Sequence, residues 1–126
     1  MLDRAHIMAF VATADADRSR AFYRDVLGMP LVAEHEFAIV FDVQGVELRI
    51  QKVVAVEPQS HTVLGWAVPS IVDAVRTLTD KGVRFETFDG LSQDPLGIWS
   101  PVPGVKVAWF KDPDGNLLSL TEKPPA

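Results

Sequence analysis

Runs of apolar residues separated by polar turns follow the same order in both halves of the chain. In the first half, the apolar run at residues 5–12 predicts a strand, and an apolar stripe along residues 16–27 predicts a helix that Asp15 caps and Gly28 ends. Three further strands are expected at residues 31–36, 37–43 and 46–53. The first half is therefore expected to form a β-α-β-β-β unit.

The second half repeats this plan. Residues 61–68 predict a strand, and Ser70 and Gly82 occupy the N-cap and helix-ending positions that Asp15 and Gly28 occupy in the first half. Strands are expected at residues 83–88, 104–110 and 116–122. Since each unit leaves one sheet face uncovered, we expect a single α+β domain over residues 1–126, made of two units at residues 5–53 and 61–122.

Composition narrows the class of protein. The chain has 126 residues, of which 48% are hydrophobic and 23% charged, as in one globular domain. A net charge of −5 gives no attraction to nucleic-acid phosphates or anionic membranes, and no segment has the roughly 20 apolar residues of a membrane span. Cysteine is absent, so disulfides and thiolate metal sites are excluded. We expect a cytoplasmic protein without nucleic-acid or membrane partners.

Two segments carry a family resemblance. "ADRSRAFYRDVLGM", at residues 16–29, closes the first helix, and "FKDPDGNLLSL", at residues 110–120, contains a tight Asp-Pro-Asp-Gly turn. Together with the duplicated plan, they resemble the vicinal oxygen chelate superfamily, which includes glyoxalase I, bleomycin-resistance proteins, fosfomycin-resistance enzymes and extradiol dioxygenases. The resemblance covers nearly the whole chain and implies a curved mixed sheet with a concave cleft.

The resemblance also implies where a metal would bind. Metal-bearing members hold a divalent ion on the concave face with His, Gln and Glu side chains. The corresponding positions in this sequence are Met8, Val63 and Ser119, with the fourth at Glu47, Arg49 or Gln51. A thioether, an aliphatic side chain and a hydroxyl are poor ligands for such an ion. The chain is thus closest in character to metal-free, bleomycin-resistance-like members, and we expect no cofactor.

A displaced metal site is the alternative. His6 and His61 each lie two residues before one of the vacant positions, and with Glu47 they could form a site of two histidines and one carboxylate. Two residues along a strand span about 6–7 Å, a large shift for ligands that must lie at about 2.1 Å from the ion. The protein would then be a metal-dependent enzyme of the glyoxalase, lyase or dioxygenase type, and whether any reaction is catalysed stays open.

Strand alternation places mainly apolar side chains on the concave face, as in a small-molecule pocket. Arg49 could bind an anionic group of a ligand or pair with Glu47. Gly65 could leave room for a ligand or allow close packing. The candidate ligand-binding residues are Met8, Phe10, Arg49, Val63, Trp99 and Ser119.

The aromatic residues of the second half have different expected places. Trp99 lies in a long segment, residues 90–104, where it could stack on a flat ligand as part of a lid or pack at a dimer interface. Trp66 is expected in the core, and either Trp109 or Phe110 faces the cleft. The leading interpretation is a protein that sequesters a planar or amphipathic small molecule. We also expect a homodimer, because open sheet faces and edges need covering.

Overall fold

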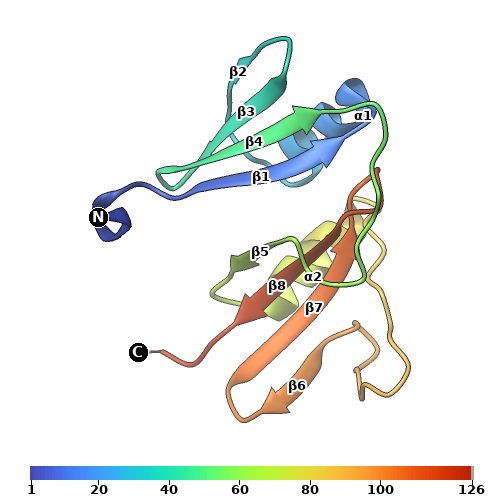
Figure 1. Cartoon of the computed structure of the whole chain (residues 1–126). Coiled ribbons are helices and arrows are strands. Elements are labelled where there is room, and N and C mark those ends of the chain that lie inside the picture. Colours follow the sequence, from blue (N-terminus) through green and yellow to red (C-terminus); the bar gives the residue numbers. More distant parts are fainter. Residues whose placement is uncertain (126) are drawn as a thin grey trace. The chain divides into compact units, whose positions relative to one another are not determined.

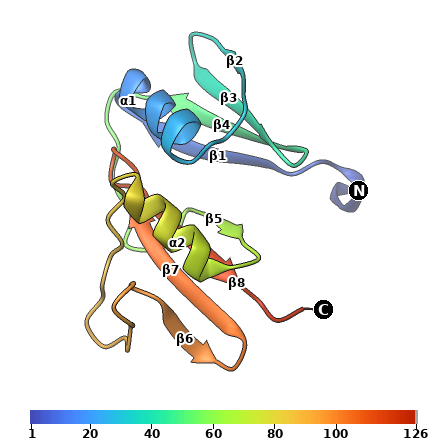
Figure 2. The ribbon, with the colours of Figure 1, turned by 180° about the vertical axis from the view of Figure 1, so that it is seen from behind.

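The computed structural model describes residues 1–125, and the chain divides into two compact units, Met1–Pro58 and the part that begins at Gln59 (Figure 1). Each unit contains one four-stranded mixed sheet and one α-helix that covers a single sheet face (Figure 2). The expected α+β class is therefore confirmed. No helix among the described residues is long and apolar enough to cross a membrane.

The first unit builds its sheet in the order β1-β4-β3-β2, with β1 parallel to β4 and the other pairs antiparallel. Its elements are a 3-10 turn at Leu2–Arg4, β1 at Met8–Thr13, α1 at Ala16–Ala21, a π-helical turn at Phe22–Val26, β2 at Leu31–Glu34, β3 at Ala38–Val43 and β4 at Val46–Lys52. Asp15 caps α1 as expected, because its carboxylate accepts a hydrogen bond from Arg18 N at 3.2 Å.

The core of the first unit lies between its helix and one face of the sheet. The buried side chains on that face come from β1, β3 and β4: Val11, Ile39, Phe41, Leu48 and Ile50. Tyr23 from the helical segment packs on them, with its ring centroid 6.1 Å from that of Phe41. Alternation leaves Met8, Phe10 and Arg49 on the opposite, open face.

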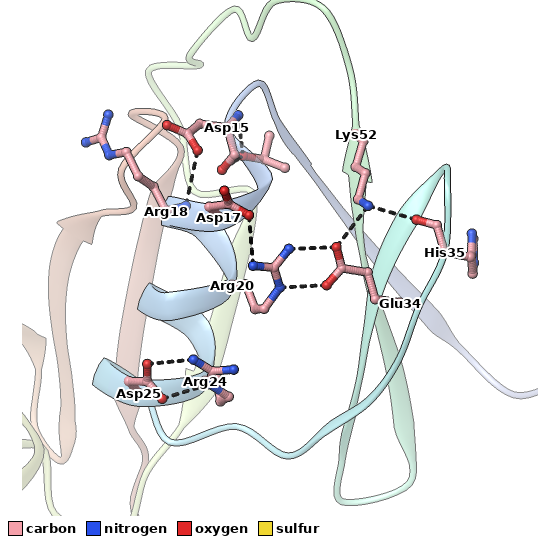
Figure 3. Close-up of polar contacts among 10 residues, drawn as sticks. Asp15, Asp17, Arg18, Arg20, Arg24, Asp25, Glu34, His35 and Lys52 are labelled. Carbon is pink, nitrogen blue, oxygen red and sulfur yellow. Dashed lines mark hydrogen bonds and ion pairs between the residues drawn. The ribbon is translucent and has the colours of Figure 1, made fainter.

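An ion-pair cluster fastens α1 to the sheet of the first unit (Figure 3). Arg20 donates two hydrogen bonds to Glu34, at 2.6 and 2.7 Å, and a third to Asp17 at 3.0 Å. Lys52 on β4 adds a contact of 2.9 Å to the same Glu34 carboxylate. The cluster thus joins the helix to two strands through a single carboxylate.

The second unit repeats the plan with sheet order β5-β8-β7-β6. Its elements are β5 at Leu64–Ala67, α2 at Ile71–Asp80, β6 at Trp99–Val102, β7 at Val105–Lys111 and β8 at Leu117–Glu122. Ser70 caps α2 by accepting a hydrogen bond from Asp73 N at 3.3 Å. Asp112 is buried in the turn between β7 and β8, where its carboxylate accepts hydrogen bonds from Asp114 N and Asn116 N. The sequence-based assignment of this segment to a turn is confirmed.

One strand of the second unit differs from expectation. Residues 83–88 form no strand, and only Phe85 makes an isolated bridge to Phe110. The edge of β7 is instead shared, because Glu86 N bonds Trp109 O near one end and β6 pairs with Val105 and Val107 near the other. Trp99 therefore begins an edge strand, and its expected place in a long loop is wrong.

The core of the second unit also lies between helix and sheet. Ile71 and Val75 of α2 are buried, as are Phe110 and Leu118 on β7 and β8. Trp66 stacks over the buried Phe110, with ring centroids 6.3 Å apart and planes 18° apart, and is itself half-buried rather than in the core. Since Phe110 points to the helix, its neighbour Trp109 points to the open face.

Candidate functional site

Three aromatic side chains form a cluster on the open face of the second sheet: Phe88, Trp99 and Trp109, called here the aromatic cluster. The Phe88 and Trp109 ring centroids lie 5.3 Å apart with an interplanar angle of 87°, an edge-to-face contact. The Trp99 and Trp109 centroids lie 5.8 Å apart with planes inclined by 33°. All three residues are half-buried, so part of each ring surface remains accessible.

Strand register explains how the two tryptophans meet. Trp109 on β7 pairs with Ser119 on β8, and Trp99 on β6 pairs with Val107, two residues from Trp109. Residues two apart in a strand face the same way, so both indoles project from the open face. The choice between Trp109 and Phe110 that the sequence left open is thereby decided in favour of Trp109.

The Trp109 indole is fixed at its polar end as well. Its Nε1–H donates a hydrogen bond to Thr62 Oγ1 at 3.2 Å, and Thr62 precedes β5. Because β8 separates β7 from β5, the indole reaches across β8 at the level of Ser119. The Ser119 side chain is accordingly buried, at 7% exposure.

Gly65 completes the surroundings of Ser119. The two residues are paired between β5 and β8, and a Cβ atom at Gly65 would lie 2.8 Å from Ser119 Oγ and 3.9 Å from Thr62 Cγ2. A side chain at position 65 would therefore clash with the hydroxyl. Of the two explanations that the sequence left open for Gly65, the geometry favours close packing.

The first unit gathers the remaining candidates on its own open face. Register places Met8 beside Glu47 and Phe10 beside Arg49, and the Met8 and Phe10 side chains are 44% and 49% exposed. Arg49 Nη1 donates a hydrogen bond to Glu47 at 3.1 Å, and its Nη2 lies 2.9 Å from His35 Nε2. The pairing with Glu47 is thus the explanation of Arg49 that the geometry supports.

The protein-family model of the Glyoxalase/Bleomycin resistance protein/Dioxygenase superfamily matches this sequence over residues 4–120. The chain belongs to this superfamily. No curated protein matches its sequence.

Solved structures of the superfamily share its fold. A glyoxalase family protein from Bacillus anthracis aligns with a TM-score of 0.76 at 19% identity over 95% of each chain. TnmS3, an antibiotic binding protein from Streptomyces sp. CB03234, aligns with a TM-score of 0.74 at 20% identity over 99% of each chain. The fosfomycin resistance protein FosX from Listeria monocytogenes aligns with a TM-score of 0.71 at 14% identity, over 91% of this chain and 89% of its own. At these identities the likeness establishes the fold.

The residues at the superfamily's expected metal positions do not suit a divalent ion. Met8 and Val63 offer no hard donor, and Ser119 Oγ is enclosed by the Gly65 backbone and the Trp109 indole. Among residues 1–125, no group of three or more His, Cys, Asp or Glu side chains is arranged to hold a metal.

The displaced site at His6, Glu47 and His61 draws on both units and stays a prediction. Both histidines are exposed, and Glu47 Oε2 accepts a hydrogen bond from Arg49.

Sequence reasoning missed two members of this site and left a third undecided. Thr62 and Phe88 fall within the strands expected at residues 61–68 and 83–88, but both lie outside regular strands in the structure, so strand alternation did not give their orientation. Trp109 had a usable signal, because the turn centred on Asp114 pairs Lys111 with Leu117 and hence Trp109 with Ser119. Counting outward from the Asp-Pro-Asp-Gly turn would have placed the indole beside the vacant ligand position.

Proposed function

We propose that this superfamily member binds a flat aromatic small molecule by stacking it on the aromatic cluster and sequesters it without making or breaking bonds. The single observation that carries the proposal is the fixed Trp109 indole. Its ring contacts Phe88 and Trp99 on the open sheet face, and its Nε1–H group donates a hydrogen bond to Thr62. A ring that is already immobilised loses little conformational entropy when a ligand stacks on it.

The geometry limits where a ligand could lie. A flat ring inserted between two indoles needs centroids about 7 Å apart, twice the usual contact distance between carbon atoms. The Trp99 and Trp109 centroids are 5.8 Å apart, so the pair is closed to insertion. The ligand is therefore proposed to stack on the accessible outer surface of the cluster. Ser119 is buried on the same sheet face, and Val63 stays a predicted ligand contact of the same unit.

Charge and family membership support this class of ligand. The net charge of −5 favours approach of a cationic molecule over an anionic one. TnmS3, which shares the fold, is described as an antibiotic binding protein. The unsuitable residues at the metal positions, Met8, Val63 and Ser119, favour binding over metal-dependent chemistry. Met8, Phe10 and Arg49 stay predicted ligand-binding residues on the open face of their own unit, and we propose that the protein works as a cytoplasmic homodimer.

Calorimetry with proflavine, a flat tricyclic cation, tests the proposal. Trp109→Leu and Trp99→Ala should each weaken binding by about 1–3 kcal/mol, because stacking and apolar burial are lost. The matched control is Phe37→Leu, which removes an exposed aromatic ring at the turn between β2 and β3 and should leave affinity unchanged. Adamantylammonium, a cation of comparable bulk without a flat face, should bind the parent far more weakly.

The enzyme alternative predicts the opposite pattern. His6→Ala or His61→Ala would then abolish uptake of nickel, manganese or zinc, while Trp109→Leu would have a mild effect. Under the binding proposal, neither histidine change alters proflavine affinity.

A further inference from the structure

Gln93 makes hydrogen bonds that cross-link the segment between α2 and β6. Its side-chain Oε1 accepts a hydrogen bond from Phe88 N at 2.8 Å, while its Nε2 donates to Glu86 O at 3.0 Å and to Gly97 O at 2.8 Å. One amide group thus holds three backbone positions that are spread along residues 86–97.

These positions adjoin every member of the aromatic cluster. Phe88 is held directly through its backbone N–H group. Gln93 itself forms an isolated bridge with Trp99, and Glu86 N donates a hydrogen bond to Trp109 O at 2.8 Å. The Gln93 side chain is therefore bonded directly to the Phe88 backbone and linked through Glu86 to the Trp109 backbone, and Gln93 itself bridges Trp99.

The remainder of the segment is also held by hydrogen bonds. Asp94 Oδ1 accepts hydrogen bonds from Leu96 N and Ile98 N, both at 2.9 Å, and Asp94 N donates to Ile98 O at 2.9 Å. Gly97 has φ of +88°, and a Cβ atom there would lie 3.3 Å from Phe85 Cβ. The segment is thus cross-linked by hydrogen bonds among its own side chains and backbone.

We propose that Gln93 is a positioning residue that sets the aromatic cluster in its ligand-binding arrangement before a ligand arrives. The expected effect on ligand binding rests on the proposed function. The expected effect on the contact between Phe88 and Trp109 does not depend on it. Without the amide, the Phe88 N–H group and two carbonyl groups lose their partners, and the backbone must move to regain hydrogen bonds with water. The Phe88 ring then leaves the indole edge.

The test compares Gln93→Met with the parent. Methionine keeps the length of the side chain and removes both polar atoms. Gln59→Met is the control, because it makes the same change at an exposed glutamine of the same unit. The ligand-independent measurement is the nuclear Overhauser contact between the Phe88 ring and the Trp109 indole, which should be lost in Gln93→Met and kept in Gln59→Met.

Proflavine kinetics give the second measurement. Dissociation from Gln93→Met should be about tenfold faster with little change in association, since a less ordered surface shortens residence rather than slowing encounter. A variant that keeps both the Overhauser contact and the dissociation rate, and loses only thermal stability, would show that Gln93 merely stabilises the fold. If the parent itself fails to bind proflavine, the proposed function is wrong, while the Overhauser comparison still decides the role of Gln93.

Gln93→Glu covers the case in which the methionine variant does not fold. The carboxylate can still accept from Phe88 N but faces two carbonyl oxygens without a proton to donate. The Overhauser contact should be weak at pH 7.5 and recover in part on acidification to about pH 3.5, below the ordinary glutamate pKa, when the protonated carboxyl group can donate to one of the two carbonyl oxygens. An unchanged contact at both pH values would overturn the inference.

Discussion

Ser19 lies on the sheet-facing side of α1, where its side chain is fully buried. Among the buried side-chain polar atoms of residues 1–125, Ser19 Oγ stands out because it has no hydrogen-bond partner. A buried hydroxyl without a partner costs about 1–3 kcal/mol, and alanine is the better helix former. We expect Ser19→Ala to raise the free energy of unfolding by about 1 kcal/mol, as measured by urea denaturation.

The control for this change is Ser60→Ala, an exposed position that should alter stability by less than about 0.5 kcal/mol. A lower stability for Ser19→Ala would show that the hydroxyl makes a stabilising hydrogen bond in solution.

For individual residues, the sequence predicted the orientation of a side chain correctly where strand alternation applies. Register confirms that Met8, Phe10 and Arg49 share one face, and it places Ser119 on the same face as Trp109. Alternation could not show that the indole reaches across β8, because that depends on a side-chain rotamer and on Thr62 from another part of the chain. Trp99 projects from the open face out of an edge strand, where the sequence analysis expected a loop.

Among the elements, Glu34 joins α1, β2 and β4 and should make the stability of the first unit depend on pH. Hydrogen bonds from Arg20, and then from Lys52, lower the pKa of Glu34 from its usual 4.5 to about 2. Because the folded-state pKa is below the unfolded-state value, the stabilisation is complete above about pH 4.5 and is lost as the pH falls to 2. We expect Glu34→Gln to lower the free energy of unfolding at pH 7 by about 1 kcal/mol. The effect is modest because the ion-pair cluster is partly exposed.

The check is urea denaturation of parent and Glu34→Gln across pH 2 to 7. The difference in stability between the two should shrink as the pH falls from 4.5 to 2, whereas Glu36→Gln, at an exposed turn, should match the parent throughout. A difference that stays constant over this range would mean that the ion pairs contribute nothing and only packing is lost.

Most elements followed from local signals, and the one wrong strand has a tertiary cause. Asp15 and Ser70 begin helices as their sequence positions predicted. Residues 83–88 alternate as a strand should, but only part of the β7 edge is available to them because β6 pairs with the rest. Competition between two segments for one edge cannot be read from either segment alone.

For the whole molecule, the duplicated plan predicted two units of one fold, and the structure divides into two compact units, each with a four-stranded mixed sheet. Each sheet keeps an open face within its own unit, and the first one exposes Met8 and Phe10. Apolar side chains and sheet edges of this kind need covering, so we predict a homodimer. Sedimentation at micromolar concentration should give twice 13.9 kDa. A species of 13.9 kDa would remove the prediction.

The central claim is that a flat aromatic ligand stacks on the open face of the second sheet. The three tryptophans make this directly measurable, because each indole N–H gives its own signal in a proton–nitrogen correlation spectrum. Trp99 and Trp109 belong to the aromatic cluster, whereas Trp66 stacks on Phe110 on the opposite, helix-covered face of the sheet. Titration with proflavine should shift the Trp99 and Trp109 signals together and leave the Trp66 signal in place. Equal shifts of all three signals, or binding that moves neither Trp99 nor Trp109, would contradict the account.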